Sequence, residues 1–229
     1  MKSDSINNLT VTANGAYSFT NLLSTGASYV ITVSTQPTGQ ICAVAGGSGT
    51  VASANISSIM VSCVSDKRIY VTTANHNGGF AGGLTGVDTF CSGDTNKPVG
   101  MVSVKAMVSS ATRVACTSAN CSVGGATENT NWIMTPNTKY IRPDATVIGI
   151  TNASGIFTFP LTTGIGTSGS MVATALSGNW QNSGNNCAVW TVNTGNSIEF
   201  RFNTSTGMGL IYSGSTNCGN ALNYYCVEQ

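Results

Sequence analysis

Charge is scarce in this chain. Asp, Glu, Lys and Arg make up 7% of its 229 residues, where an ordinary soluble domain has roughly a quarter. The formal net charge is +1, and the sequence has neither a basic run nor an acidic tail. Because nothing in it would hold a phosphate backbone by electrostatics, the composition argues against nucleic-acid binding.

Long apolar runs are missing as well. No stretch approaches the ~20 apolar residues of a membrane-spanning helix. The first residues, "MKSDSINN", lack the apolar core of a signal peptide. An exported protein needs such a signal, so we expect the natural chain to begin before Met1.

Histidine occurs once, as His76. It could act as a general base for a hydroxyl nucleophile. However, no carboxylate lies near it in sequence, and the chain has no Gly-x-Ser-x-Gly elbow. The simpler interpretation is a surface or turn histidine that makes one hydrogen bond.

Other catalytic patterns also fail. The glycines of residues 78–86 contain no i, i+2 pair and no Gly-Lys-Ser/Thr ending, so they match neither phosphate-binding template. Glycosidase chemistry needs two carboxylates, but Glu199 alternates with aromatic residues and so lies on a polar strand face. Asp88 is interpreted as part of a solvated helix face or as a cap partner. We therefore expect no enzyme and no cofactor.

Cysteine is well represented. An even number in a polar, charge-poor chain predicts four disulfides and an oxidising compartment. A zinc site needs close cysteine pairs, and the closest pair, "CTSANC", has four intervening residues and no partner pair. We expect no metal. The eight cysteines are Cys42, Cys63, Cys91, Cys116, Cys121, Cys187, Cys218 and Cys226.

Residues 1–64 are expected to form a small all-β domain. "LTVTANGAYSF" alternates apolar and polar residues around Asn14-Gly15, which predicts a β-hairpin. Further strands are predicted in "SYVITVST", "GQICAVAGGSGTV" and "NISSIMVSCV". Cys42 and Cys63 are expected to join neighbouring strands or two sheets of a sandwich. The charged "SDKR" then marks a linker.

Residues 65–229 are expected to form an α+β domain with many short strands and few helices. Leu84, Val87 and Cys91 share one face of a predicted helix, and "VKAMVSS" is compatible with strand or helix. Residues 164–178 are rich in Gly, Ser and Thr and are expected to form a surface loop. The strands are predicted in "RIYVTT", "TKYIRPD", "TVIGIT", "GIFTFPL", "CAVWTV", "SIEFRFN", "MGLIYSG" and "LNYYCVEQ".

Two tryptophans stand in polar surroundings, where an aromatic ring can stack on a sugar or anchor a protein partner. Trp132 lies in "TENTNWIM" and Trp180 in "SGNWQNSGNN". Trp190 and Tyr225, next to cysteine-bearing strands, are assigned to the core. The candidate ligand-binding residues are Trp132, Trp180, Ser183, Asn185 and Asn186.

The order of the cysteines resembles that of the C-type-lectin-like fold. Cys91 falls on the first helix and Cys226 on the last strand, with Cys187 and Cys218 between them. The resemblance implies the bridges Cys91–Cys226 and Cys187–Cys218, which leaves Cys116–Cys121 as a local clip.

Several separated motifs sharpen this resemblance. "RIYVTTANHNGGFAGGLTGVDTFC", "KAMVSS", "CAVWT" and "NYYCVEQ" resemble the uncharacterised domain of leptospiral surface lipoproteins, which is related to C-type-lectin-like and endostatin-like domains. The first 64 residues are similar to a small Ig-like bacterial surface module. That module normally opens with a Gly-Leu-x-Gly-x-Val-x-Leu strand, which is missing here, so an exposed edge could pair with another chain.

The resemblance implies a surface-exposed, non-enzymatic adhesin with a role in host interaction and virulence. It would bind host extracellular proteins (matrix proteins, plasminogen or complement regulators) through loops of the lectin-like domain. The protein would be secreted, or anchored to the outer membrane through a lipid that this sequence does not include.

The alternative is a calcium-independent carbohydrate-binding module that acts through Trp180 and the asparagines of "NWQNSGNN". The calcium-dependent lectins use Glu-Pro-Asn or Gln-Pro-Asp and a Trp-Asn-Asp strand. This chain has "TPN", "RPD" and "WTV" in their place, so calcium-dependent sugar binding is not expected.

Overall fold

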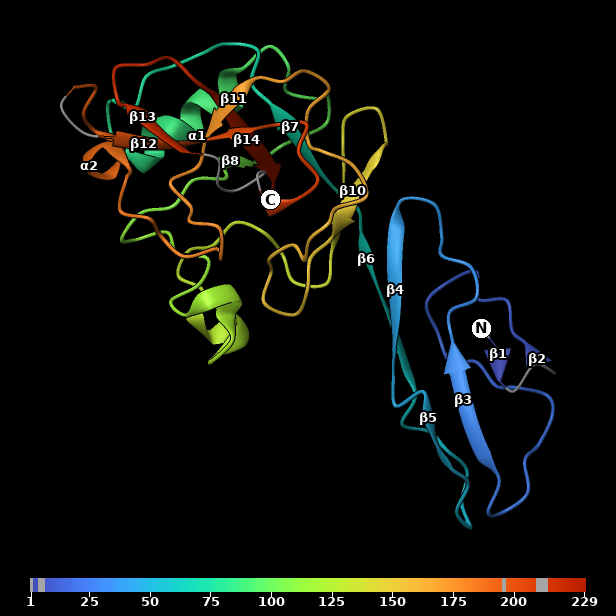
Figure 1. Cartoon of the computed structure of the whole chain (residues 1–229). Coiled ribbons are helices and arrows are strands. Elements are labelled where there is room, and N and C mark those ends of the chain that lie inside the picture. The colour runs from blue at the N-terminus through green and yellow to red at the C-terminus, as the bar shows by residue number, and fades with distance from the viewer. Residues whose placement is uncertain (1, 4–6, 195–196, 209–213) are drawn as a thin grey trace. The chain divides into compact units, whose positions relative to one another are not determined.

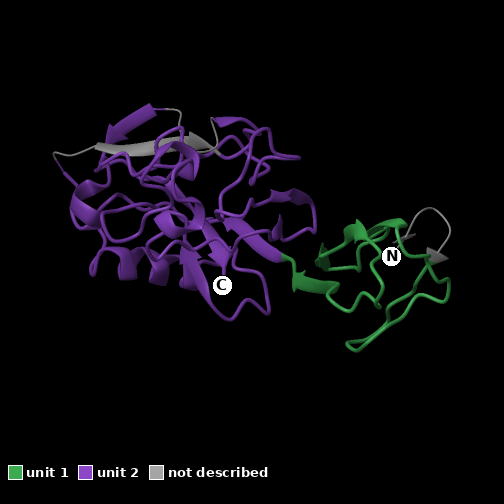
Figure 2. Cartoon of the chain, turned by 90° about the horizontal axis from the view of Figure 1, so that it is seen from below, with its two compact units in different colours: residues 1–66 green, residues 67–229 purple. Residues whose placement is uncertain are grey.

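The computed structural model describes residues 2–3, 7–194, 197–208 and 214–229. The chain divides into two compact units, Met1–Asp66 and Lys67–Gln229, which Figure 2 colours separately. The predicted boundary, between residues 64 and 65, lies two residues before this division. Strands outnumber helices in the described part of the chain (Figure 1). None of the helices in this part has the length and apolar character needed to cross a membrane.

Unit 1 consists of two small sheets. Tyr29 and Ile31, two residues apart on β3, point to the same side and are buried, together with Cys42 of β4. Strands are therefore confirmed in three of the predicted segments, those that contain β3, β4 and β6. One sheet has the order β2-β1-β3-β5 and the other pairs β4 with β6; their bounds are β1 (Lys2–Ser3), β2 (Asn7–Asn8), β3 (Ser28–Thr32), β4 (Gln40–Ala45), β5 (Ser48–Thr50) and β6 (Met60–Ser65).

The hairpin predicted around Asn14-Gly15 is wrong. Residues 9–19 contain no strand, and Val11 and Tyr17 are 43% and 41% exposed. The Tyr17 hydroxyl instead donates to the Ala13 carbonyl oxygen, at 2.9 Å. An alternating segment becomes a strand when its apolar side has a core to cover, and unit 1 has only three buried hydrophobic side chains among its described residues.

Unit 2 is built around one mixed sheet. Its order is β10-β9-β7-β14-β11-β12-β13, and β8 also pairs with β14. The central β14 runs antiparallel to β7 and β8 and parallel to β11. The bounds are β7 (Lys67–Val71), β8 (Val104–Ala106), β9 (Lys139–Ile141), β10 (Val147–Ile150), β11 (Met171–Ala173), β12 (Ser197–Phe202), β13 (Gly214–Asn217) and β14 (Asn223–Glu228).

The core of unit 2 covers both faces of β14. Successive strand residues point to opposite faces: Tyr224 and Cys226 belong to one buried cluster, and Tyr225 and Val227 to the other. Helix α1 (Leu84–Gly93) confirms the predicted helix. Its buried residues, among them Val87, join the first cluster. The remaining helical turns are η1 (Ala119–Cys121), η2 (Gly125–Glu128) and α2 (Cys187–Trp190).

All eight cysteines are paired. Cys42 and Cys63 lie directly opposite each other on the neighbouring strands β4 and β6. The bridges of unit 2 are Cys91–Cys226, Cys187–Cys218 and Cys116–Cys121, as the resemblance implied. Cys91–Cys226 fastens α1 to β14 across 135 residues, a loop for which the chain-entropy account gives about 5 kcal/mol of stabilisation. Four disulfides indicate a compartment outside the cytoplasm.

The strand predicted in "CAVWTV" is wrong, because residues 187–190 form a left-handed turn. Their φ angles are 52°, 50°, 59° and 65°. The Asn186 side chain accepts a hydrogen bond from the Val189 N–H, at 3.0 Å. The turn buries both Cys187 and Trp190. The apolar residues that suggested a strand are thus explained by the burial of Cys187 and Trp190 in this turn.

One segment left open between strand and helix and two other predicted strands have different outcomes. "VKAMVSS" contains strand β8. "GIFTFPL" contains no strand, and only an isolated bridge joins Thr151 to Phe157. "MGLIYSG" lies mainly on residues 209–213, outside the described residues.

Candidate ligand-binding cleft

Several strands of unit 2 bring their loops to the same end of the sheet. β7 and β9 are parallel, whereas β14 and β11 run in the opposite direction. The carboxyl ends of β7 and β9 therefore meet the amino ends of β14 and β11. β12 is antiparallel to β11 and also finishes there. The residues next to these ends are mostly polar and uncharged.

A cleft of about 550 Å³ lies at this end of the sheet. This volume falls within the roughly 300–1,000 Å³ of small-ligand sites. The loop before β11 contributes hydroxyls, and the partly exposed Val71 contributes apolar surface. Its amide side chains are those of Asn75, Asn96, Asn203 and Asn223.

Two of these asparagines are fixed by the main chain. Asn223 donates through Nδ2 to the Thr72 carbonyl oxygen, at 2.7 Å. Asn96 donates through Nδ2 to the Val71 carbonyl oxygen, also at 2.7 Å. Two of the four amides that line the cleft therefore already pair with peptide carbonyls of the protein itself.

The charged side chains that line the cleft are held by hydrogen bonds. Arg142 donates from Nε to the Gly164 carbonyl oxygen, at 2.7 Å, and from Nη2 to the Gly166 carbonyl oxygen, at 3.0 Å. Asp144 accepts from the Thr146 N–H, at 3.0 Å, and this bond lowers the pKa of its carboxyl group. One cation and one anion leave the cleft close to neutral.

Tyr70 forms part of the wall without offering its hydroxyl. The ring is buried, and the hydroxyl donates to the Cys91 carbonyl oxygen. Burial, and then the charge of Asp94, raise the pKa of Tyr70, so the phenol stays neutral at physiological pH.

Asn203 differs from the other asparagines. The residue is 1% exposed, and its Oδ1 atom is buried without a hydrogen-bond partner. Its main chain is fixed, since the N–H donates to Ser170 O, at 3.2 Å, and the carbonyl accepts from Gly166 N–H, at 2.8 Å. A Cβ at Gly166 would lie 2.4 Å from Asn203 Nδ2. The amide therefore lies directly against a glycine of the cleft wall.

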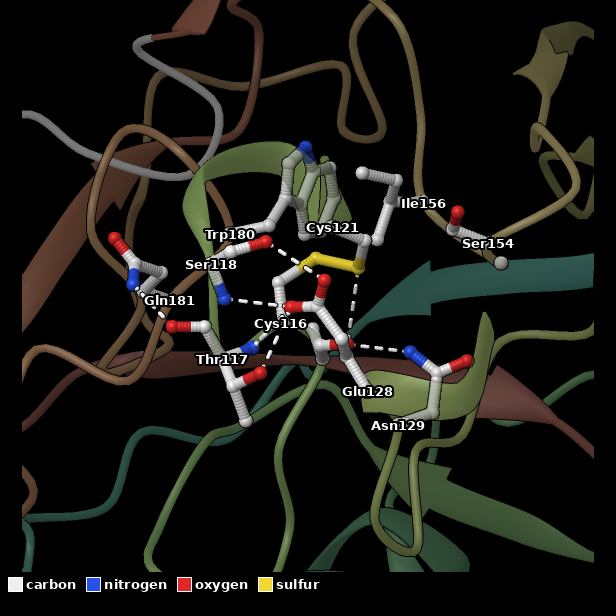
Figure 3. Close-up of a disulfide and its surroundings, with 12 residues drawn as sticks. Cys116, Thr117, Ser118, Cys121, Glu128, Asn129, Ser154, Ile156, Trp180 and Gln181 are labelled. Carbon is white, nitrogen blue, oxygen red and sulfur yellow. Dashed lines mark hydrogen bonds between the residues drawn. A yellow bond between two sulfur atoms is a disulfide. The ribbon is translucent and has the colours of Figure 1, made fainter. Parts of the chain in front are cut away.

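The prediction that Trp180 is a contact residue is wrong. Its side chain is fully buried, stacks on Phe159 with ring centroids 6.0 Å apart and donates to the Phe157 carbonyl oxygen. Figure 3 shows the indole next to the Cys116–Cys121 bridge. Its polar sequence neighbours form a surface turn, whereas the ring itself fills the core.

The other predicted ligand-binding residues do not line the cleft. Trp132 is partly buried and donates to the Gly155 carbonyl oxygen, at 2.8 Å. Ser183 donates to the Ala175 carbonyl oxygen, and its Oγ accepts from the Asn185 N–H. Asn186 is 8% exposed and caps the left-handed turn. These side chains organise their own loops.

Glu128 is a carboxylate held by hydrogen bonds (Figure 3). Oε2 accepts from the N–H and hydroxyl of Thr117 and from Ser118 N–H, and Oε1 accepts from Ser118 Oγ, Gly124 N–H and Val123 N–H. The Ser118 bonds, the largest influence, hold its pKa far below the usual range. The carboxylate therefore orders the loop closed by the Cys116–Cys121 bridge.

Asp88 and His76 both make contacts that stabilise the fold. Asp88 was expected on a solvated face or at a cap, but its Oδ2 lies 2.6 Å from Arg113 Nη2, in an ion pair whose arginine side chain is 6% exposed. The prediction of a solvated carboxylate is therefore wrong. His76 stacks on Phe80 at 3.9 Å. Among the described residues, no carboxylate lies within ion-pair distance of its ring.

The asparagines of the cleft were not among the residues predicted from the sequence. Asn203 and Asn223 lie at strand ends, Asn96 follows α1 and Asn75 lies in the loop after β7, so only the strand order brings them together. The signal that could have identified them is the placement of polar residues directly at strand ends.

The fold and cleft define a disulfide-bonded domain of mixed α and β structure, with many strands and few helices, that carries a polar, nearly neutral surface cleft. The family described as "Protein of unknown function (DUF1554)" matches residues 72–206, and the chain belongs to this family. No curated protein matches the sequence.

Proposed function

We propose that this chain is a surface-exposed, non-enzymatic adhesin-like protein that binds host macromolecules through the cleft of unit 2. The observation that carries the proposal is the cleft itself, in which amides, hydroxyls and some apolar surface converge at one end of a sheet. The proposed partners are extracellular-matrix proteins, plasminogen or complement regulators. The protein would be secreted or lipid-anchored at the outer membrane.

The architecture of unit 2 supports a binding scaffold. The Cys91–Cys226 bridge joins α1 to the central strand, and Arg68 pairs with Glu228 between β7 and β14, with Nη2 and Oε1 2.7 Å apart. A sheet fixed in this way tolerates irregular loops at its end, and binding residues are frequent on such loops. The bridge pattern supports a C-type-lectin-like domain related to that of leptospiral surface lipoproteins, preceded by an Ig-like module.

A calcium-independent carbohydrate-binding module is the second candidate. The amides and hydroxyls of the cleft favour it, because such groups can bind sugar hydroxyls. The observation against it is the position of the tryptophans. Neither Trp132 nor Trp180 lines the cleft, so neither ring is placed to stack on a sugar in it.

The test uses the full chain with its disulfides intact. Immobilised matrix proteins, plasminogen and complement regulators are probed with wild type and with Ser168→Trp, which places a large side chain on an exposed residue of the cleft wall. Thr158→Trp, at an exposed residue outside the cleft, is the matched control. We expect Ser168→Trp to weaken binding at least about tenfold and Thr158→Trp to leave it unchanged. Equal binding by both variants, or no binding by wild type, would overturn the proposal.

A further inference from the structure

The side chain of Asn203 is an unusual feature of the cleft. Native proteins provide partners for about 90% or more of their buried polar groups, and each exception needs an explanation. Asn203 is 1% exposed, and its Oδ1 has no hydrogen-bond partner. No hydrogen bond of its Nδ2 is found within the described part of the chain either. An amide in this position has both of its hydrogen-bonding functions available.

The surrounding structure keeps this amide at the cleft wall. Its main chain is bonded on both sides, to Ser170 and to Gly166, and the side chain packs against Gly166 where there is no room for a Cβ. The remaining freedom is the terminal χ2 torsion, which is broad in asparagine. A small rotation about χ2 therefore presents Oδ1 or Nδ2 to a group bound in the cleft.

The chemistry of the amide selects the partner. A carboxylate or phosphate has only acceptors and leaves Oδ1 unsatisfied. A residue of an extended chain presents its own N–H and its own C=O along the same edge, and these can pair with Oδ1 and Nδ2 of one asparagine. The neighbouring asparagines show the donor half of this pairing, since Nδ2 of Asn96 and Nδ2 of Asn223 each donate to a main-chain carbonyl of the protein.

The rest of the cleft also fits a polypeptide. The Arg142 guanidinium is bound to two carbonyl oxygens, and Asp144 balances its charge, so the cleft does not select for net charge. Val71, which is partly exposed, provides apolar surface for a ligand side chain. Tyr70 is the aromatic residue among those described in the lining, and it is 1% exposed, which disfavours sugar stacking.

We infer that Asn203 is a ligand-binding residue that binds the main chain of an extended polypeptide segment of the macromolecule held in the cleft. This inference rests on the proposed function, because it assigns the ligand of the same cleft. Recognition through the main chain depends little on the ligand's sequence, so segments of different proteins would bind.

The test measures binding of uncharged, acetylated and amidated ten-residue peptides to the full chain. The probes are a library of such peptides, the same library with alternate main-chain nitrogens methylated, and a panel of neutral oligosaccharides. The readout is the side-chain amide signal of Asn203 in a ¹⁵N-labelled sample, together with the dissociation constants. We expect the unmethylated peptides to shift this signal and the methylated peptides to bind at least about tenfold more weakly.

Asn203→Leu separates a binding role from a structural one. Replacing an unpaired buried amide by an apolar side chain of similar shape is neutral or stabilising for the fold. The variant should therefore keep or raise the unfolding temperature while losing about tenfold or more in peptide affinity. Asn55→Leu, at an exposed asparagine of unit 1, should leave both quantities unchanged.

Several results would overturn the inference. These are equal peptide binding by wild type and Asn203→Leu, undiminished binding of the methylated library, or a strong loss of stability in Asn203→Leu. If oligosaccharides alone shift the Asn203 signal, the cleft is a saccharide site and the polypeptide assignment fails. If Ser168→Trp abolishes binding of a host macromolecule while no peptide binds wild type, the proposed function survives without this inference.

Discussion

The left-handed turn at residues 187–190 allows a stringent test of the fold. Four consecutive non-glycine residues have φ between 50° and 65°, a conformation that crowds Cβ against the next carbonyl oxygen. Ala188 is the most suitable position for a substitution. Its side chain is exposed, so Ala188→Gly removes the crowding without removing buried surface.

The expected gain follows from two opposing effects. The left-handed conformation costs an L-residue roughly 1–2 kcal/mol, and glycine avoids this cost. Glycine also gives the unfolded chain more freedom, which costs roughly 0.5–1 kcal/mol relative to alanine. The net stabilisation is about 0.5–1 kcal/mol, which raises Tm by about 1–4 °C for a domain of this size.

A matched substitution separates this effect from a general response to glycine. Ala126 is also exposed but lies in η2 without a positive φ, so Ala126→Gly should lower stability by about 0.5–1 kcal/mol. Ala145, exposed with φ 66°, should respond to glycine as Ala188 does.

Urea and thermal unfolding followed by tryptophan fluorescence report on unit 2, because all three tryptophans lie in it. The reasoning is refuted if Ala188→Gly destabilises the protein as much as Ala126→Gly. That result would mean that the turn is not left-handed in solution.

Two further predictions concern the buried charges. Asp88→Ala leaves Arg113, which is 5% exposed, without its carboxylate, and should cost about 3 kcal/mol in urea unfolding; a loss below about 1 kcal/mol would contradict a buried ion pair. Hydrogen bonds from Ser118 and Gly124 hold the pKa of Glu128 far below its usual range. Its carboxylate therefore contributes fully to the stability of the fold above about pH 4.3, the ordinary glutamate pKa. This contribution is lost as the pH falls below that value towards the lowered pKa of the folded state. The difference in unfolding midpoint between wild type and Glu128→Gln should therefore shrink from pH 7 to pH 2, and a constant difference would exclude this role.

The parts of the fold that the sequence predicted correctly have strong local patterns. β7 and β14 read as strands, and Val87 and Cys91 identify the buried side of α1. The local pattern at Asn14-Gly15 predicted a β-hairpin that does not form. The turn signal was present, but no core was available to cover the flanking residues. The pairing of the six cysteines in unit 2 was available only through the resemblance, since spacing alone leaves fifteen possible pairings.

The candidate site could not be predicted from the sequence because it depends on the order of the strands in the sheet. Asn96, Asn203 and Asn223 are separated by more than a hundred residues in total, and each is unremarkable in its own segment. They meet because β14 inserts between β7 and β11, a topology that no local pattern specifies. Trp180 was wrongly predicted to be a contact residue for a related reason. Its neighbours are polar because their side chains lie at the surface, while its own ring enters the core.

The scarcity of charge in the sequence has a structural counterpart in unit 2. Asp88 of α1 and Arg113, in the loop after β8, neutralise each other, Arg68 and Glu228 do so between β7 and β14, and Arg142 is bound to carbonyl oxygens. These charges stabilise the scaffold. If the cleft binds as proposed, affinity must come from its amides, hydroxyls and apolar surface, because ions already paired within the protein contribute little to attracting a charged partner. The unpaired Oδ1 of Asn203 would then gain a hydrogen bond that the free protein does not supply.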